Sequence, residues 1–84
     1  MFRRGYRFFS SDPDLEIKNA IKQYSKNFDT FIDIGAAVGS VTFSVATNFS
    51  KCFCFEPEKR NYEEFKNKLE NNGLKNIEIF NFAL

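Results

Sequence analysis

The sequence predicts an α/β fold, in which helices and strands alternate around a parallel sheet. Three short apolar stretches are rich in aromatic, β-branched or cysteine residues, as buried strands are. A stretch with apolar residues at helical spacing precedes each of them, and the short connections favour parallel pairing through crossover helices. We therefore expect the order helix-strand-helix-strand-helix-strand, a Rossmann-like doubly wound sheet truncated after its third strand.

The first helix is expected over residues 13 to 27, after a leader of residues 1–12. Ser11 or Asp12 is a suitable N-cap, and Pro13 then occupies the first helical position, where its missing N–H is harmless. Residues 13–84 would form the domain. The apolar residues that recur at spacings near 3.6, and that we expect on the core face of this helix, are Leu15, Ile17, Ile21, Tyr24 and Phe28.

The first strand is expected at residues 30–34, a β-branched and aromatic run that stops at Gly35. The second helix should follow Gly39, with Val41, Val45 and Phe49 on one face. Strand and helix are thus joined by a turn of small residues.

The second strand is expected at residues 52–56, because Pro57 disfavours helical geometry at the residue before it. Residues 58–72 form the clearest helix, rich in Glu, Lys and Asn, and Gly73 stands at the C′ position that favours glycine. A third strand follows at residues 77–80. The apolar face of the third helix would consist of Tyr62, Phe65 and Leu69.

Composition excludes several classes of function. With 12 Lys+Arg and 11 Asp+Glu the net charge is +1, which gives no electrostatic basis for general nucleic-acid or membrane-surface binding. The absence of histidine excludes histidine-ligated zinc and a serine-histidine-aspartate triad. Cys52 and Cys54 are too few for a disulfide framework, so we expect core packing, no metal site and a reducing, cytoplasmic location. No apolar run is long enough for a membrane span.

The candidate site lies where the strands end, because ligands of open α/β sheets bind at the carboxyl ends of the strands. Asp33 ends the first strand, and the small-residue loop between Gly35 and Gly39 opens the next helix. Glu56 lies 21 residues past Gly35, a spacing from which a carboxylate accepts hydrogen bonds from ribose hydroxyls. Asp33 would repel a pyrophosphate, whereas S-adenosylmethionine is cationic and carries no phosphate. The residues therefore favour that methyl donor, with NAD as the alternative.

Several blocks of the sequence, in the same order and spacing, resemble the FkbM-type S-adenosylmethionine-dependent methyltransferases. The similarity extends over residues 31–84, and the blocks that carry it are residues 31–39, 55–57, 61–62, 71–76 and 81–84. Members of this family typically methylate hydroxyl oxygens of sugars or polyketide-type natural products. The resemblance implies an enzyme that transfers the sulfonium methyl of S-adenosylmethionine to a small-molecule or glycan hydroxyl.

The resemblance also implies roles for individual residues. The loop from Asp33 to Gly39 would cradle the methionine portion of the donor, Glu56 would hold the ribose, and the residues after the third strand would border the adenine. Ala37 departs from the family pattern, which usually has asparagine there. The donor-binding residues implied in this way are Asp33, Gly35, Ala36, Gly39, Glu56, Phe82 and Ala83.

The resemblance covers only the donor-binding half of the family's domain, whose fold continues through roughly four more strands. No general base can be named, and the catalytic residues stay unknown. An unpaired edge on the first strand would favour association. Two other hypotheses therefore stay open: a dinucleotide-binding module, and a non-catalytic fragment that assembles with another chain to complete the sheet.

Overall fold

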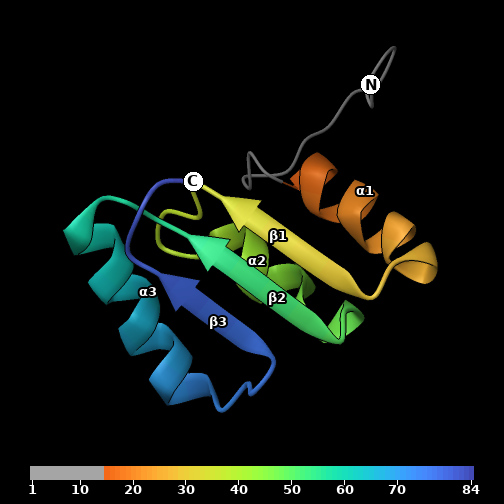
Figure 1. Cartoon of the computed structure of the whole chain (residues 1–84). Helices are drawn as coiled ribbons and strands as arrows, with labels where there is room; N and C mark the ends of the chain where they lie inside the picture. Colours follow the sequence, from red (N-terminus) through yellow and green to blue (C-terminus); the bar gives the residue numbers. More distant parts are fainter. Residues whose placement is uncertain (1–14) are drawn as a thin grey trace.

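A computed structural model describes residues 15–84 and shows a three-stranded parallel sheet (Figure 1). The strands are β1 (Thr30–Ile34), β2 (Lys51–Phe55) and β3 (Ile77–Phe80), in the order β1-β2-β3. Helices lie between successive strands, so the fold is α/β and Rossmann-like in the expected order. This arrangement confirms the fold class that the sequence predicts.

Three helices accompany the sheet. They are α1 (Leu15–Tyr24), α2 (Ser40–Val45) and α3 (Lys59–Asn72). Short 3₁₀ turns, η1 (Ser25–Asn27) and η2 (Ala46–Asn48), extend the first two. Among residues 15–84, no helix combines the length and the apolar character needed to cross a membrane.

The first helix ends near the expected position but turns a different side toward the core. The expected N-cap residues, Pro13 and the leader lie outside the described residues. Ile17, Tyr24 and Phe28 are exposed, whereas Lys18 is buried and Ile21 packs against the core. The expected apolar face is therefore wrong for those three exposed residues. The reason is that α1 packs beside α2 at the margin of the core, which leaves these three side chains exposed.

The third helix has the boundaries that its sequence predicts. Its N-cap is Glu58, whose side-chain oxygen accepts a hydrogen bond of 2.7 Å from the backbone N–H of Asn61. Gly73 ends it in the left-handed region at φ +75°. Phe65 is fully buried and anchors the helix in the core. Capping at both ends and one buried ring explain why this helix could be read from the sequence.

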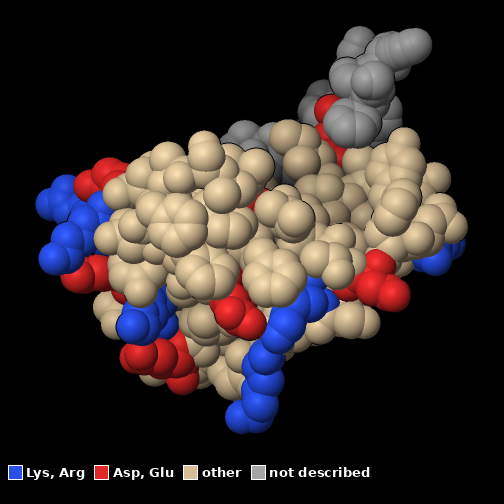
Figure 2. Space-filling model, viewed as in Figure 1, with Lys and Arg blue, Asp and Glu red and all other residues tan. Residues whose placement is uncertain are grey.

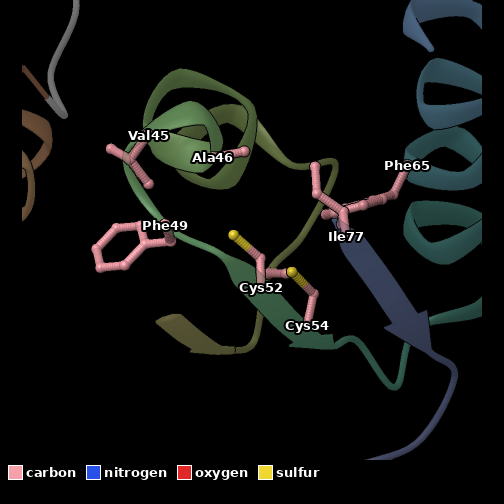
Figure 3. Packing of buried hydrophobic residues seen from close by; sticks show 8 residues of the cluster. Val45, Ala46, Phe49, Cys52, Cys54, Phe65 and Ile77 are labelled. Atoms are coloured by element: carbon pink, nitrogen blue, oxygen red, sulfur yellow. The ribbon is translucent and has the colours of Figure 1, made fainter. Parts of the chain in front are cut away.

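The core fills the space between one face of the sheet and the helices (Figure 3). Cys52 and Cys54 point from β2 into this core and are fully buried free thiols, as expected from their spacing of two. In this core, α1 contributes Ile21, which packs against the buried cluster. The remaining buried apolar side chains of the cluster are Ala36, Val45, Ala46, Phe49, Phe65 and Ile77.

The opposite face of the sheet is bare among the described residues. Side chains alternate along a strand, so the neighbours of the core-facing residues point to this second face. Ile32 and Ile34 of β1 are 56% and 66% exposed there. Phe55 and Phe80 stack beside them with ring centroids 5.2 Å apart. Figure 2, viewed from this side, shows a mostly uncharged surface that is interrupted by a few charged side chains and bordered by others.

Candidate functional site

The loop between β1 and α2 bends sharply over the end of β2. Gly35 has φ +77° and Ala37 has φ +54°, values in the left-handed region that favours glycine. The backbone N–H groups of Gly35 and Ala36 both donate to the carbonyl oxygen of Phe55, at 2.8 and 3.1 Å. These two bonds attach the start of the loop to the last residue of the neighbouring strand.

The end of the loop is packed into the protein. A Cβ on Gly39, which has φ +95°, would lie 2.5 Å from the ring of Phe43 and 2.9 Å from the ring of Phe65. The two rings belong to different helices, Phe43 to α2 and Phe65 to α3. Ala36 is also buried in the core, so its side chain faces away from solvent. Of the expected loop contacts, only Gly35 is exposed with open space above it.

Glu56 lies directly after β2 and reaches back to the loop. Its side chain is almost completely buried, at 6% exposure. One carboxylate oxygen, Oε1, accepts a 2.7 Å hydrogen bond from the N–H of Ala37, and Oε2 accepts a 3.0 Å bond from the N–H of Glu58. A carboxylate has about four lone-pair positions, so each oxygen can accept a further hydrogen bond. Glu56 therefore holds the loop and still has acceptor capacity.

Asp33 points from β1 toward the helices, and its Oδ2 accepts a 2.7 Å hydrogen bond from the hydroxyl of Thr42. Burial raises the pKa of the Asp33 carboxyl, the hydrogen bond from Thr42 opposes this change, and the charge of Glu56 raises the pKa further. Glu56 is therefore hydrogen-bonded to the loop itself, whereas Asp33, two residues before Gly35, is hydrogen-bonded to α2.

Thr42 is a residue of this site that the sequence analysis missed. It is fully buried on α2, and its hydroxyl oxygen also lies 3.3 Å from the sulfur of Cys54. Burial raises the pKa of Cys54 to about 12, so the thiol keeps its proton at neutral pH. The available signal was a polar residue between Val41 and Val45 in a mostly apolar stretch. Its partners, Asp33 on β1 and Cys54 on β2, could not be read from the sequence.

The segment after β3 supports the same edge of the sheet. The side-chain amide of Asn81 donates to the carbonyl oxygens of Glu56 and Pro57, at 2.9 and 3.1 Å. Phe82 is 49% exposed, and its ring centroid lies 5.5 Å from that of Phe55. Ala83 is exposed beside it in the chain. Phe82 therefore lies at the expected edge, against the aromatic rings of the bare face.

Acidic and thiol side chains do not form a metal site in the described part of the chain. Within residues 15–84, no three of them are grouped so that they could hold a metal ion. The chemistry of this site therefore rests on backbone N–H groups, one hydroxyl and two carboxylates.

Comparison with known proteins identifies a fold and no family. No family model matches the chain, and no curated protein matches it. Among solved structures, the YcgJ protein from Bacillus subtilis superposes with a TM-score of 0.66 at 15% identity, over 75% of this chain and 28% of that one. Precorrin 8W decarboxylase from Methanobacterium thermoautotrophicum superposes with a TM-score of 0.68 at 17% identity, over 88% of this chain and 41% of that one.

These similarities define the class of the protein as a Rossmann-like α/β fold. At 15% and 17% identity they carry the fold alone. The chain spans less than half the length of either solved structure. Function therefore has to be argued from the residues at the carboxyl ends of the strands.

Proposed function

We propose that the chain binds S-adenosylmethionine and forms the donor-binding half of a methyltransferase of the FkbM type. The observation that carries the proposal is that two carboxylates flank one small-residue loop, because Glu56 accepts a hydrogen bond from Ala37 and Asp33 lies two residues before Gly35. A cationic nucleoside without phosphates suits two negative side chains, because each contributes attraction in a partly desolvated site. The resemblance over residues 31–84 points to the same ligand.

Each residue of the site has a task in this proposal. When bound, S-adenosylmethionine supplies the reactive methyl group on its sulfonium. Asp33 would balance the positive charge of the methionine portion, and Glu56 would accept hydrogen bonds from the ribose through its remaining lone pairs. Gly35 leaves the loop open to the ligand because no atom lies within 4 Å of where its Cβ would be. Phe82 and Ala83 would border the adenine.

The acceptor in this proposal is a hydroxyl of a sugar or a polyketide-type product, as the resemblance implies. The protein's contribution to such a transfer is alignment of the hydroxyl with the methyl group and exclusion of water. The described residues include no group that the structure ties to an acceptor. The donor site is therefore the part of the proposal that this chain can test by itself.

Calorimetric titration with S-adenosylhomocysteine tests donor binding directly. We expect weak binding to the native chain, and a loss of at least about tenfold in Asp33→Asn, which removes a charge but keeps the shape of the side chain. Glu64→Gln is the matched control, because Glu64 is an exposed acid on α3. No heat of binding to the native chain, or equal affinity in native and Asp33→Asn proteins, would contradict the proposal.

NAD is the competing ligand, since a glycine turn followed by an acid also serves dinucleotides. Asp33 argues against it, because a negative charge two residues before Gly35 would repel the negative pyrophosphate. The same titration with NAD separates the two hypotheses. Binding of NAD without binding of S-adenosylhomocysteine would favour the dinucleotide module.

A second candidate function, assembly, is favoured by the bare face of the sheet. Parallel sheets are normally covered on both faces, yet Ile32, Ile34 and Phe82 are about half exposed or more. This face also carries a pair of opposite charges, Lys51 and Glu78, at 3.3 Å, so this pair gives two copies of the face no net repulsion. We propose that two copies bury this face against each other in a two-fold contact.

Light scattering during size-exclusion chromatography tests this second candidate. We expect a dimer whose fraction increases with concentration, and a monomer for Ile34→Lys, which places a charge on the proposed contact face. Ile17→Lys, which alters an exposed isoleucine on α1, is the matched control. A native chain that stays monomeric at every concentration would exclude the dimer.

A further inference from the structure

We propose that Thr42 is a positioning residue for Asp33, and that the thiol of Cys54 fixes the direction in which the Thr42 hydroxyl donates its proton. This inference rests on the proposed binding of S-adenosylmethionine, because it concerns the carboxylate assigned to the donor. It adds a buried side chain that reaches the ligand only through Asp33.

The direction of the hydrogen bonds follows from counting protons. A threonine hydroxyl has one proton, and an ionised carboxylate can only accept. The Thr42 proton therefore goes to Oδ2 of Asp33, at 2.7 Å. The remaining contact, 3.3 Å between the Thr42 oxygen and the Cys54 sulfur, then needs the proton of the thiol. The hydrogen bonds therefore run from the Cys54 S–H to the Thr42 hydroxyl, and from that hydroxyl to the Asp33 carboxylate.

The location of the three residues makes this chain of hydrogen bonds rigid. Asp33 and Cys54 are paired residues of neighbouring strands, and both point to the helix side of the sheet. Thr42 approaches them from the first turn of α2, and both Thr42 and Cys54 are fully buried. Water therefore cannot replace the thiol or the hydroxyl without opening the core. The orientation of Asp33 is therefore set, on the core side of the sheet, by two groups that solvent does not reach.

The surroundings of Asp33 offer no other described group that favours its charged form. The titratable groups that interact with it are Glu56, Cys52 and Cys54. All three are neutral or negative, so none attracts a second negative charge. The Thr42 hydroxyl is the contact that lowers the pKa of Asp33 against burial and against the charge of Glu56.

Removal of the hydroxyl should therefore act on affinity in a pH-dependent way. In Thr42→Val, which keeps the shape of the side chain, the pKa of Asp33 rises further, so a larger fraction of Asp33 is neutral at acidic pH. A neutral side chain attracts the ammonium group of S-adenosylhomocysteine less strongly. The ratio of the Kd of the variant to that of the native protein should then increase as the pH is lowered.

The experiment is calorimetric titration of the native chain, Thr42→Val and Thr42→Ser with S-adenosylhomocysteine from about pH 4, the ordinary range of an aspartate, up to about pH 8. We expect Thr42→Val to bind about tenfold more weakly than the native chain at the acidic end of this range and closer to native at the basic end. Thr42→Ser, which restores the hydroxyl, should follow the native curve. A destabilised fold alone would not produce a pH-dependent ratio that serine rescues.

The outcomes separate the two proposals. If the native chain binds no S-adenosylhomocysteine, the proposed function fails. If the native chain binds and Asp33→Asn does not, while Thr42→Val matches the native Kd at every pH, the role of Thr42 is overturned. A direct titration of the Asp33 carboxyl carbon by NMR in native, Thr42→Ser and Thr42→Ala proteins needs no ligand. An unchanged pKa in Thr42→Ala would also overturn it.

Discussion

The two ends of the loop between β1 and α2 carry the same residue type for different reasons. Gly39 is buried, and a side chain there would meet the rings of Phe43 and Phe65. Gly35 has a similar positive φ, but no atom lies within 4 Å of where its Cβ would be. One end is fixed to the core by packing, and the other stays open at the edge of the sheet. A binding loop needs both a rigid attachment and a free surface.

The largest effect is expected for Gly39→Ala. The backbone strain at positive φ and the overlap with two rings together should lower the free energy of unfolding by about 3 kcal/mol. Gly35→Ala and Gly73→Ala are the matched controls, because both have positive φ and open space. They should cost only about 1 kcal/mol each.

Urea unfolding followed by circular dichroism measures all three variants. The difference between Gly39→Ala and the two controls isolates the packing contribution at the closed end of the loop. An equal loss of unfolding free energy in all three variants would show that backbone strain alone accounts for the effect. The inferred difference in packing between Gly39 and Gly35 would then be wrong.

The next effect concerns the attachment of the open end by Glu56. Glu56→Ala leaves the N–H groups of Ala37 and Glu58 without their acceptor, which should lower the free energy of unfolding by about 2 kcal/mol. Glu56→Gln keeps one acceptor oxygen and should lose about half as much. Chemical denaturation is the measurement. A native-like stability of Glu56→Ala would mean that water satisfies both donors and that the carboxylate does not hold the loop.

A smaller gain is expected at Ala37, which has φ +54° without being glycine. Asparagine tolerates the left-handed region better than alanine, so Ala37→Asn should raise the free energy of unfolding by about 0.5 kcal/mol. Ala36→Asn should be destabilising instead, because Ala36 is buried in the core. Thermal melts distinguish a rise in Tm for the first from a fall for the second.

The smallest effect is a pH dependence of stability that arises from Asp33. Its pKa is raised in the folded chain, so the folded state binds the proton more tightly than the unfolded state does. The contribution of Asp33 to stability is therefore most favourable at acidic pH and is lost as the pH rises through the folded pKa. We expect the change in Tm that Asp33→Asn causes to be more positive at pH 7 than at pH 4. The opposite sign would mean that Asp33 is stabilised as a carboxylate.

The alternation of helices and strands could be predicted because each element carries a local signal. Residues 30–34 form a short β-branched and aromatic run that stops at a glycine. The third helix ends at Gly73, whose positive φ is the conformation that favours glycine there. The placement of Asp33 and Glu56 at strand ends followed from the same local reasoning. Their location at one loop followed from the rule that parallel strands end at one edge of the sheet.

The remainder of the site depends on contacts between distant residues. The bond between Glu56 and Ala37 spans 19 residues, and nothing in either residue type identifies the other. The orientation of α1 is set by its packing on α2, which buries Lys18 and exposes Ile17 in contrast to the hydrophobic pattern. The amide of Asn81, which joins two carbonyl oxygens after β2, likewise becomes visible only in three dimensions.

The two thiols of β2 provide an internal reporter of motion in this region. Cys52 and Cys54 have no exposed surface, and burial raises the pKa of each, so a thiol reagent can attack them only after the core opens. The rate of their modification therefore measures how often the sheet separates from α2. A ligand held by the adjacent loop should slow that rate, so the reaction of these two buried cysteines reports whether the site is occupied.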